Sequence, residues 1–368
     1  MAEFFKYGHA TAPQWREATQ ACLLQIGNVP ATANLGFIYV TDILAAHMQD
    51  IVDMIKQATG VNHWVGSAGI GICCTGREYM DQPAIVIMLG EFAADAFQVF
   101  GIQQSDEIEG VLKRGIHAYF GIVHGDPENR SMPVLIEQFA AQLESGFVVG
   151  GLTSSRNGNV QVADEITRGG LSGVVFSSAV TVATRLTQGV SPLGKMHEIT
   201  ECDGNVIIRI DNRPAFDVLK EEIGEVLSKD LNRLAGYIFV GLPVPGSDTG
   251  DYLVRNLVGI DVEQKLLAIG DYIERGNHLL FCRRDGASAV HDMQRMLGEL
   301  ESGMTGKPKG AIYFSCLGRG ESMFGPDSAE LKMISRELGD VPLVGFFANG
   351  EISNHRLYSY TGVLTVFL

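Results

Sequence analysis

The apolar stretch Leu35-Gly36-Phe37-Ile38-Tyr39-Val40 is followed by a helical pattern and then by Val65-Gly66-Ser67-Ala68-Gly69. Two later stretches, residues 117–155 and 311–351, repeat this arrangement. Each copy joins an apolar strand, a helix and a second strand with a Val-Gly step, over roughly thirty to forty residues. A chain built from such copies brings several glycine-rich segments to one place.

A further apolar strand follows each copy, at 84–89, 173–183 and 362–368. The helical segments carry apolar residues at steps of three and four, which is typical of helices that cover a sheet with one face. We therefore predict a mixed α/β (α+β) fold. Repeated strand-helix-strand-strand units form its sheets, helices cover the sheets, and the chain has two intimately packed halves.

The chain has 368 residues, which exceeds the size at which a single hydrophobic core usually keeps growing. We predict an N-terminal helical segment at 1–34, a first half at 35–230 and a second half at 231–368. No signal peptide is expected, because no long apolar block follows the first charged residues.

Composition excludes several classes of partner. The formal net charge is −15 and no cluster of Lys and Arg offsets it, so neither nucleic acid nor an anionic membrane surface is expected to bind. The apolar runs are too short to span a bilayer. Six cysteines without metal or disulfide spacing fit a reducing cytoplasm.

The glycine-rich segments have two interpretations. The spacing Gly66-Ser67-Ala68-Gly69-Ile70-Gly71 differs from that of dinucleotide-binding loops and leads to a strand. The glycines either form tight turns with positive φ, or leave backbone N–H groups of three matching loops free to hold a small anion or carboxylate.

The most specific local motif is Ser315-Cys316-Leu317-Gly318-Arg319-Gly320-Glu321, which a helix separates from the segment 345–352. An arginine on one loop, opposite Asn349 and Glu351 on another, could hold both charged ends of an amino-acid-like ligand. The alternative is that Arg319 and Glu351 pair with each other and lock the two loops.

The predicted site takes residues from loops of both halves. Its ligand contacts are Ser67, Ser154, Arg156, Arg255, Arg319, Asn349 and Glu351, and the glycines that shape its loops are Gly66, Gly150 and Gly345.

These motifs resemble a known family. The patterns Ser-Cys-x-x-Arg-Gly and Gly-Phe-x-x-x-Gly-Glu-Ile, with the upstream run 252–261, resemble the C-terminal half of the FIST sensory domain. Val65-Gly66-Ser67, Val149-Gly150-Gly151 and the run 204–215 resemble its N-terminal half. The resemblance extends from about Leu35 to the end, which leaves little room for an attached output domain. The chain departs from the usual pattern at Ala348-Asn349, where an aromatic residue before the glycine is commoner.

The resemblance implies a cytoplasmic sensory protein in signal transduction that binds small molecules such as amino acids. It implies partners among histidine kinases of two-component systems, cyclic-di-GMP enzymes or chemoreceptors. Some members of the family are haem proteins that sense nitric oxide, which is the alternative function. The family supplies no settled catalytic residues.

Haem needs an axial ligand in an apolar pocket. The candidate is His124, which we expect just past a strand, with Asp126 able to orient it. The alternative is a polar loop residue in the turn Gly125-Asp126-Pro127. The sequence has no Cys-x-x-Cys-His for covalent attachment of haem.

Cysteine chemistry and catalysis complete the expectations. Cys73 and Cys74 should point to opposite faces of an extended segment, one thiol buried and one exposed. Cys316 beside Arg319 is the better candidate for a thiolate, and the redox role of all three stays open. The chain lacks the Gly-x-Ser-x-Gly, His-Glu-x-x-His and Walker patterns, so we expect a binding protein and not an enzyme.

Overall fold

The computed structural model describes residues 4–112, 116–228, 234, 236–244 and 252–368. The chain forms two compact units. The large unit comprises residues 1–187 and 290–368, and the inserted unit comprises residues 188–289. The boundary predicted between residues 230 and 231 lies outside the described residues. The inserted unit interrupts the large unit in sequence.

The large unit consists of three repeats with the same order of elements. The first contains β1 (Phe5–Thr11), α1 (Trp15–Ile26), β2 (Leu35–Thr41), η1 (Asp42–His47), α2 (Met48–Thr59), β3 (His63–Gly69), β4 (Gly71–Cys74), β5 (Arg77–Met80) and β6 (Ala84–Gly90). The second contains β7 (Phe97–Ile102), η2 (Ser105–Glu107), α3 (Ile108–Leu112), β8 (Phe120–Gly125), α4 (Met132–Ala141), β9 (Phe147–Leu152), β10 (Gln161–Ala163), β11 (Glu165–Thr167) and β12 (Leu171–Phe176). The third contains β13 (Val182–Gln188), α6 (Gly286–Gly303), β21 (Gly310–Cys316), α7 (Glu321–Phe324), α8 (Ala329–Leu338), β22 (Leu343–Ala348), β23 (Glu351–Asn354), β24 (Arg356–Tyr358) and β25 (Thr361–Phe367).

The three repeats exchange hairpins in a ring. The sheets have the strand orders β1-β6-β2-β3-β10-β11, β7-β12-β8-β9-β23-β24 and β13-β25-β21-β22-β4-β5. Each sheet therefore takes four strands from one repeat and a hairpin from another. The central pairs β2–β3, β8–β9 and β21–β22 are parallel, as strands joined by a helix must be. Because each sheet needs a hairpin from another repeat, no repeat can form its complete sheet alone.

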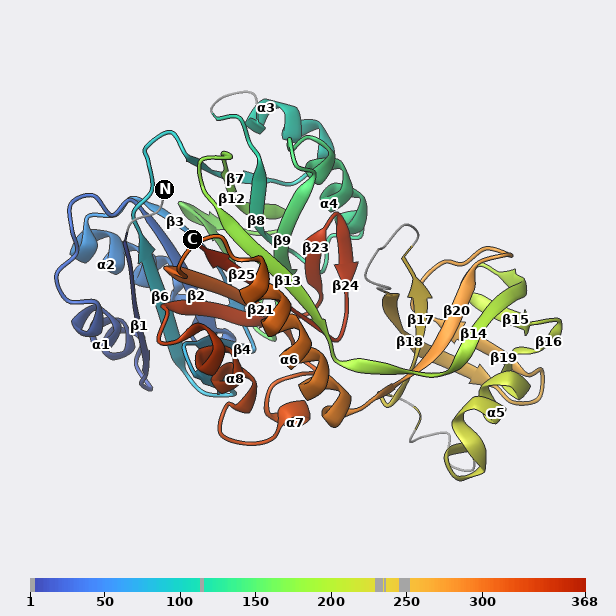
Figure 1. The fold of residues 1–368 in the computed structure, drawn as a ribbon. Helices are drawn as coiled ribbons and strands as arrows, with labels where there is room; N and C mark the ends of the chain where they lie inside the picture. The colour runs from blue at the N-terminus through green and yellow to red at the C-terminus, as the bar shows by residue number, and fades with distance from the viewer. Residues whose placement is uncertain (1–3, 113–115, 229–233, 235, 245–251) are drawn as a thin grey trace. The chain divides into compact units, whose positions relative to one another are not determined.

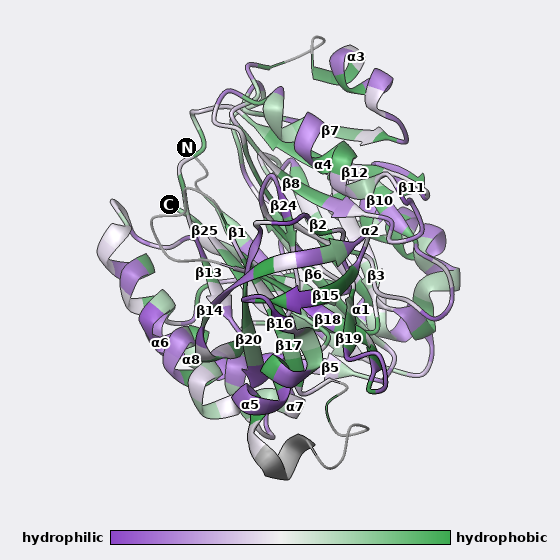
Figure 2. Cartoon of the chain, turned by 90° about the vertical axis from the view of Figure 1, so that its right-hand side faces the viewer, coloured by the Kyte–Doolittle hydropathy of each residue, from purple (hydrophilic) through white to green (hydrophobic). Residues whose placement is uncertain are grey.

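Each sheet is buried on both faces. The inner faces of all three meet in one core that is rich in phenylalanine. The outer faces pack on helices: α1 and α2 on the first sheet, α4 on the second, and α6 and α8 on the third. Figure 1 shows α1 and α2 beside β1, and α6 and α8 beside β21. In Figure 2 these helices carry polar and apolar stripes, while strands such as β2 and β25 are largely apolar. The predicted fold of repeated units with helix-covered sheets is confirmed.

The inserted unit is a small antiparallel barrel. Its strands are β14 (Val190–Asp203), β15 (Val206–Ile210), β16 (Arg213–Pro214), β17 (Ile238–Pro243), β18 (Tyr252–Asp261), β19 (Leu266–Ile269) and β20 (His278–Arg284). The long strand β14 pairs with β20 at one edge of the sheet and with β15 near the other, which closes it. Helix α5 (Ala215–Ser228) packs on the apolar interior of this barrel.

Candidate functional site

The glycines of the Val-Gly steps lie inside strands and not in loops. Gly66, Gly150 and Gly345 belong to β3, β9 and β22, and none of them has a positive φ. A Cβ atom at any of the three would lie 1.7–2.0 Å from a backbone carbonyl oxygen of the neighbouring parallel strand. Both sequence interpretations were therefore wrong about these three positions: the glycines allow the two parallel strands of each repeat to approach closely.

The same register aligns three side chains at the centre of the large unit. The residues that follow the carbonyl partners of these glycines are Tyr39, His124 and Phe314. Their rings contact one another, with centroids 5.6–6.3 Å apart, although they come from three different sheets. Tyr39 Oη lies 3.1 Å from His124 Nε2. Equivalent positions in the repeats thus hold a phenol, an imidazole and a phenyl ring around one point.

His124 does not suit the role of a haem ligand. It lies within β8, not past its end, and its side chain is completely buried. Nε2 is within hydrogen-bond distance of Tyr39, and the rings of Tyr39, Phe314 and Phe346 pack against the imidazole. Burial lowers the pKa of His124 to about 3, so the ring is neutral. A macrocycle beside this ring would have to displace the aromatic core.

Asp126, which was expected to orient His124, forms its hydrogen bonds with other residues. Asp126 accepts hydrogen bonds from Asn159 Nδ2 at 3.0 Å and from the backbone N–H groups of Glu128 and Gly169 at 2.9 and 2.8 Å. It therefore orders the loops after β8 and β11 and does not orient the imidazole. His124 Nδ1 is buried without a hydrogen-bond partner.

Arg319 is buried, and it pairs with Glu330, a carboxylate that was not predicted from the sequence. Arg319 follows β21 and donates from Nε to Glu330 Oε1 at 2.8 Å, with both side chains at 0% exposure. Burial alone would lower the pKa of Arg319, but the charge of Glu330 outweighs that effect and raises it. The expected alternative pairing of Arg319 with Glu351 is not among the ion pairs of the described residues.

Glu330 lies at the start of α8 and accepts four hydrogen bonds. They come from Tyr313 Oη at 2.6 Å, Ser315 Oγ at 3.1 Å, Arg319 Nε at 2.8 Å and the N–H group of Gly320 at 2.9 Å. This carboxylate fixes both the side chain of Arg319 and the backbone after it. A local signal existed, because Glu330 stands four residues before the buried Ile334, on the apolar side of α8.

Among the described residues, no hydrogen-bond acceptor pairs with the other two nitrogens of the Arg319 guanidinium. Nη1 and Nη2 are both buried and make no hydrogen bond. One face of the guanidinium packs on the ring of Phe324, with Cζ 4.8 Å from the centroid. Buried cationic donors are rarely left unpaired, because the lost hydration is not replaced. These two nitrogens are the donors that bind a carboxylate in a bidentate pair.

Glu351 is a second incomplete group close to Arg319. Its Oε2 accepts hydrogen bonds from the N–H group of Thr361 at 3.0 Å and from Thr361 Oγ1 at 2.8 Å, while Oε1 is buried without a partner. Burial raises the pKa of Glu351 to about 8, although the hydrogen bonds from Thr361 and the charge of Arg319 act in the opposite direction. We call Cys316, Arg319, Glu330 and Glu351 the Arg319 cluster.

The two predicted serines, Ser67 and Ser154, are buried near the ends of β3 and β9, and both form hydrogen bonds within the protein. Ser67 Oγ lies 2.9 Å from Thr153 Oγ1, and Ser154 Oγ donates to the carbonyl of Phe347 at 2.5 Å. Ser154 Oγ also accepts from the N–H group of Ile70 at 3.1 Å. These hydroxyls tie the ends of β3, β9 and β22 together.

Like the two serines, three further predicted contacts lie outside the Arg319 cluster. Arg156 is 53% exposed and forms an ion pair with Asp42, with Nε 2.9 Å from Oδ2. The side chain of Asn349 is exposed, although Glu351 two residues later is buried. Arg255 belongs to the inserted unit, where its Nε donates to Asp271 at 2.7 Å. Arg319 and Glu351 thus lie close enough for the charge of Arg319 to act on Glu351, whereas these three residues have other surroundings.

The cysteines differ from two expectations. Cys73 and Cys74 do face opposite sides of β4, but both are buried because both faces of that sheet are covered. Burial raises the pKa of Cys316, and the neighbouring Glu351 adds to this more than Arg319 counters it. The thiol of Cys316 is therefore held protonated, contrary to the thiolate that its neighbour suggested.

Comparison with known proteins agrees with this architecture. The FIST N domain model matches residues 34–213, and the FIST C domain model matches residues 215–354. The chain belongs to the FIST family. FIST domains are associated with sensory signal transduction. The N domain match covers the first repeat from β2 onward, the second repeat, β13 and the beginning of the barrel. The C domain match covers the rest of the barrel and the third repeat from α6 to β23.

Two relatives match over almost their whole length. An uncharacterized protein of Mycobacterium tuberculosis (strain H37Rv) is 28% identical over 388 residues, covering 98% of each chain. An uncharacterized protein of Mycobacterium bovis is 29% identical over 389 residues, again covering 98% of each chain. Among the described residues of this FIST protein, no helix is long and apolar enough to cross a membrane. Nor does that part of the chain bring three or more His, Cys, Asp or Glu side chains together as a metal site would.

Proposed function

We propose that this FIST protein is a sensor that binds a small carboxylate-bearing metabolite, such as an amino acid, at the Arg319 cluster. The observation that carries the proposal is the buried guanidinium of Arg319, which offers two unpartnered nitrogens on the side away from Glu330. A ligand carboxylate would complete both hydrogen bonds at once in the bidentate geometry that arginine favours.

Glu351 favours a ligand that also carries an amino group. An ammonium group beside Oε1 would supply the missing hydrogen bond and would favour the ionised carboxylate. The pKa of about 8 means that Glu351 can change its protonation state near neutral pH when such a charge arrives. The Arg319 cluster thus offers groups for both ends of an amino acid.

The ligand reaches the Arg319 cluster when the segment between β21 and α8 moves. This segment carries Arg319 itself, the four-residue helix α7 and Phe324, which covers the guanidinium. Gly320 and Gly325 flank α7 with positive φ, so the segment has glycine at both of its bends. A ligand that binds the opened and closed forms with different affinity shifts their populations, which is the requirement for signalling.

The proposed role is binding and not catalysis, because the reactive groups nearby are held in unreactive forms. The Cys316 thiol is kept protonated, and the neutral His124 is enclosed by aromatic rings. The proposed partner is a separate signalling protein, a histidine kinase, a cyclic-di-GMP enzyme or a chemoreceptor. The proposed location is the cytoplasm, where the six free cysteines would remain reduced.

The test is a thermal-shift and calorimetric screen of amino acids and related carboxylates on the full chain. A ligand at a hundredfold excess over its dissociation constant adds about 2.7 kcal/mol to the free energy of unfolding. Arg319→Lys keeps the positive charge but loses the two parallel N–H donors of the guanidinium. We expect it to weaken binding at least tenfold, a change of about 1.4 kcal/mol. Arg156→Lys is the matched control and should bind normally. Equal affinity in folded Arg319→Lys would refute the site.

A further inference from the structure

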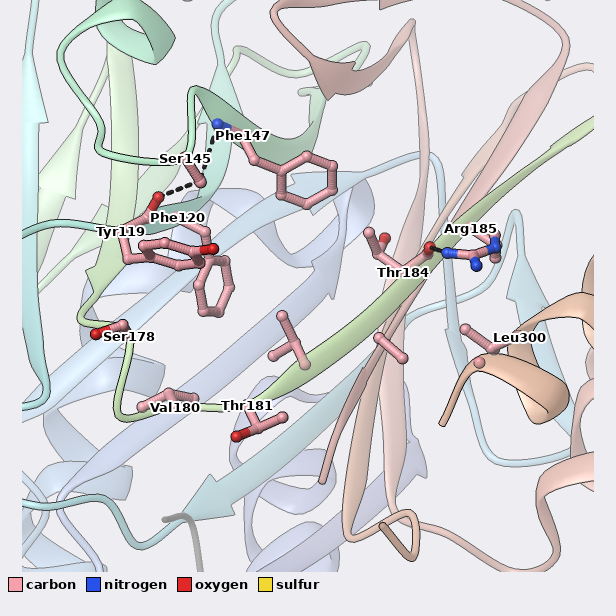
Figure 3. Close-up of a pocket in the computed structure, with 13 residues that line it drawn as sticks. Tyr119, Phe120, Ser145, Phe147, Ser178, Val180, Thr181, Thr184, Arg185 and Leu300 are labelled. Carbon is pink, nitrogen blue, oxygen red and sulfur yellow. Dashed lines mark hydrogen bonds between the residues drawn. The ribbon is translucent and has the colours of Figure 1, made fainter. Parts of the chain in front are cut away.

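A cavity of about 630 Å³ lies in the large unit at the amino ends of β8 and β9, away from the strand ends that carry the Arg319 cluster. Phe120 and Phe147, the first residues of these strands, form one wall, as Figure 3 shows. Strand β13 contributes Val182 and Arg185, and α6 contributes Leu300. The size is typical of sites for small organic ligands.

The threefold repetition shows what is missing from this cavity. Strands β1, β7 and β13 are equivalent edge strands, and their first residues are Phe5, Phe97 and Val182. The residue before each accepts a hydrogen bond from the end of its repeat: Phe4 from Glu91, Ala96 from Ser177, and Thr181 from Leu368. The three positions therefore correspond in register as well as in order.

In the first two repeats a phenyl ring fills the junction with the next sheet. Phe5 packs against the start of β21, where a Cβ atom on Gly310 would lie 2.6 Å from its ring. Phe97 packs against the start of β3, with its ring centroid 5.6 Å from that of His63. In the third repeat the corresponding neighbours are the starts of β8 and β9, and the short side chain of Val182 leaves the cavity between them.

We propose that this cavity binds a small aromatic carboxylate, whose ring takes the place beside Val182 that a phenylalanine ring takes in the other repeats. Phe120 supplies an aromatic wall that is itself stacked on Phe176, with centroids 5.0 Å apart. The ligand's carboxylate pairs with the guanidinium of Arg185, an exposed lining residue near Gly303 of α6, whose Nη1 also donates to the carbonyl of Thr184 at 2.8 Å. Figure 3 shows the side chain of Arg185 beside Thr184, with its hydrogen bond to the Thr184 carbonyl, and the rings of Phe120 and Phe147 farther along the cavity.

The test uses 3-phenylpropionate, indole-3-acetate and naphthalene-1-acetate as probes, with calorimetry and ligand-observed NMR on the full chain. We expect saturable binding of at least one probe to the unmodified protein. Val182→Phe fills the space with the protein's own ring, as in the other repeats, and should abolish binding while raising the melting temperature. Arg185→Gln should weaken binding about tenfold and remove most of its salt dependence.

Matched controls separate this site from the Arg319 cluster. Val134→Phe adds the same ring at a position on α4 that is 50% exposed, and should leave probe binding unchanged. Arg319→Lys should also bind the probes normally, so failure of the amino-acid proposal would not affect this one. The proposal is overturned if none of the probes binds saturably at millimolar concentration, or if folded Val182→Phe binds them as the unmodified protein does. Should Val182→Phe not fold, Arg185→Gln decides: undiminished binding would refute the site.

Discussion

Arg156 and Arg319 were both predicted as ligand contacts, and each pairs with a carboxylate of the large unit, but the two pairs differ in the structure. Arg156, in the loop after β9, is 53% exposed and uses all three guanidinium nitrogens: Nε and Nη2 bond to Asp42, and Nη1 bonds to Asp81. Arg319, after β21, is at 0% exposure and uses Nε alone. The half-exposed arginine, whose partner Asp42 is buried, thus has every guanidinium nitrogen paired within the protein, whereas the buried arginine does not.

This difference indicates that Arg156 has a structural role, whereas Arg319 is suited to bind a ligand. Water can replace any missing partner of an exposed guanidinium, so the completeness of the Arg156 pair serves to join the β9 loop to η1. Water does not reach Nη1 and Nη2 of Arg319, and an unpaired buried donor costs free energy until a partner arrives. A ligand that supplies the missing acceptors binds more tightly, because it removes the cost of the two unpaired donors.

The largest expected effect is on Glu330. Glu330→Gln removes the only carboxylate paired with Arg319 among the described residues and leaves the cation buried. We expect the free energy of unfolding to fall by about 3–5 kcal/mol, because breaking a buried pair exposes the full cost of the remaining charge. Urea denaturation measures it, and Arg156→Gln serves as the comparison. A loss below about 1 kcal/mol would show that Arg319 is solvated.

The second prediction concerns the pH dependence of stability. As the pH rises, the contributions of Glu351 and Asp42 to the free energy of unfolding change in opposite directions. The folded-state pKa of Glu351, about 8, exceeds the ordinary value of 4.5, so the folded chain keeps a proton that the unfolded chain loses. The contribution of Glu351 to the free energy of unfolding is therefore largest below about pH 4.5 and falls as the pH rises to about 8, on the order of a few kcal/mol in all.

At Asp42 the sign is reversed. Burial would raise the pKa of Asp42, but the hydrogen bonds and charge of Arg156 outweigh it and hold the pKa below the ordinary 3.8. Its contribution is present above pH 3.8 and is lost as the pH falls through the folded-state pKa. Urea unfolding between about pH 3 and pH 9 tests both, with Glu351→Gln and Asp42→Asn as variants. Glu78, whose pKa burial raises to about 7, contributes with the same sign as Glu351, so only the difference from Glu351→Gln is diagnostic.

Phe324 gives a smaller effect that is specific to the buried region. Phe324→Ala removes the ring that covers the guanidinium of Arg319 and should lower the free energy of unfolding by about 1 kcal/mol. The same change should speed ligand association, because the segment that closes over Arg319 loses its main contact with it. Stopped-flow mixing with the amino acid found in the screen measures the rate. An unchanged rate would contradict the proposed route of access.

The smallest effect is expected at Arg156. Arg156→Gln should lower the melting temperature less than Glu330→Gln does, because the buried carboxylate of Asp42 keeps the backbone N–H group of residue 156 as a donor. The part that comes from the exposed pair with Asp81 should shrink in high salt. Thermal denaturation at low and high ionic strength measures it. A loss comparable with that of Glu330→Gln would erase the distinction between the two regions.

Much of the fold could be predicted from local patterns. Apolar stretches and helical stripes predicted the three strand-helix-strand repeats, since alternation and 3.6-residue periodicity are properties of short segments. The Val-Gly steps were found but explained wrongly. Gly66, for example, is required by the carbonyl of a strand nearly thirty residues away and not by a turn.

The Arg319 cluster was predicted in part. Arg319 and Glu351 were identified because arginine and glutamate in glycine-rich loops are unusual unless they bind or pair, and both proved buried. Their hydrogen-bond partners, Glu330 and Thr361, were not identified from the sequence. Glu330 lies on a helix whose apolar stripe is clear without it, and Thr361 is the first residue of the last strand. His124 was expected in a loop because Gly125-Asp126-Pro127 follows it, but the strand continues through it.

Local sequence thus determined the repeats, the helix-covered strands and two residues of the candidate site. The tertiary structure decided which hairpin completes which sheet, that Arg319 pairs with Glu330 and not Glu351, and that Val182 leaves open a junction that Phe5 and Phe97 close. The physical reason is that propensity and periodicity act within a few turns of chain, whereas burial, ion pairing and packing at a junction depend on residues brought together from distant repeats.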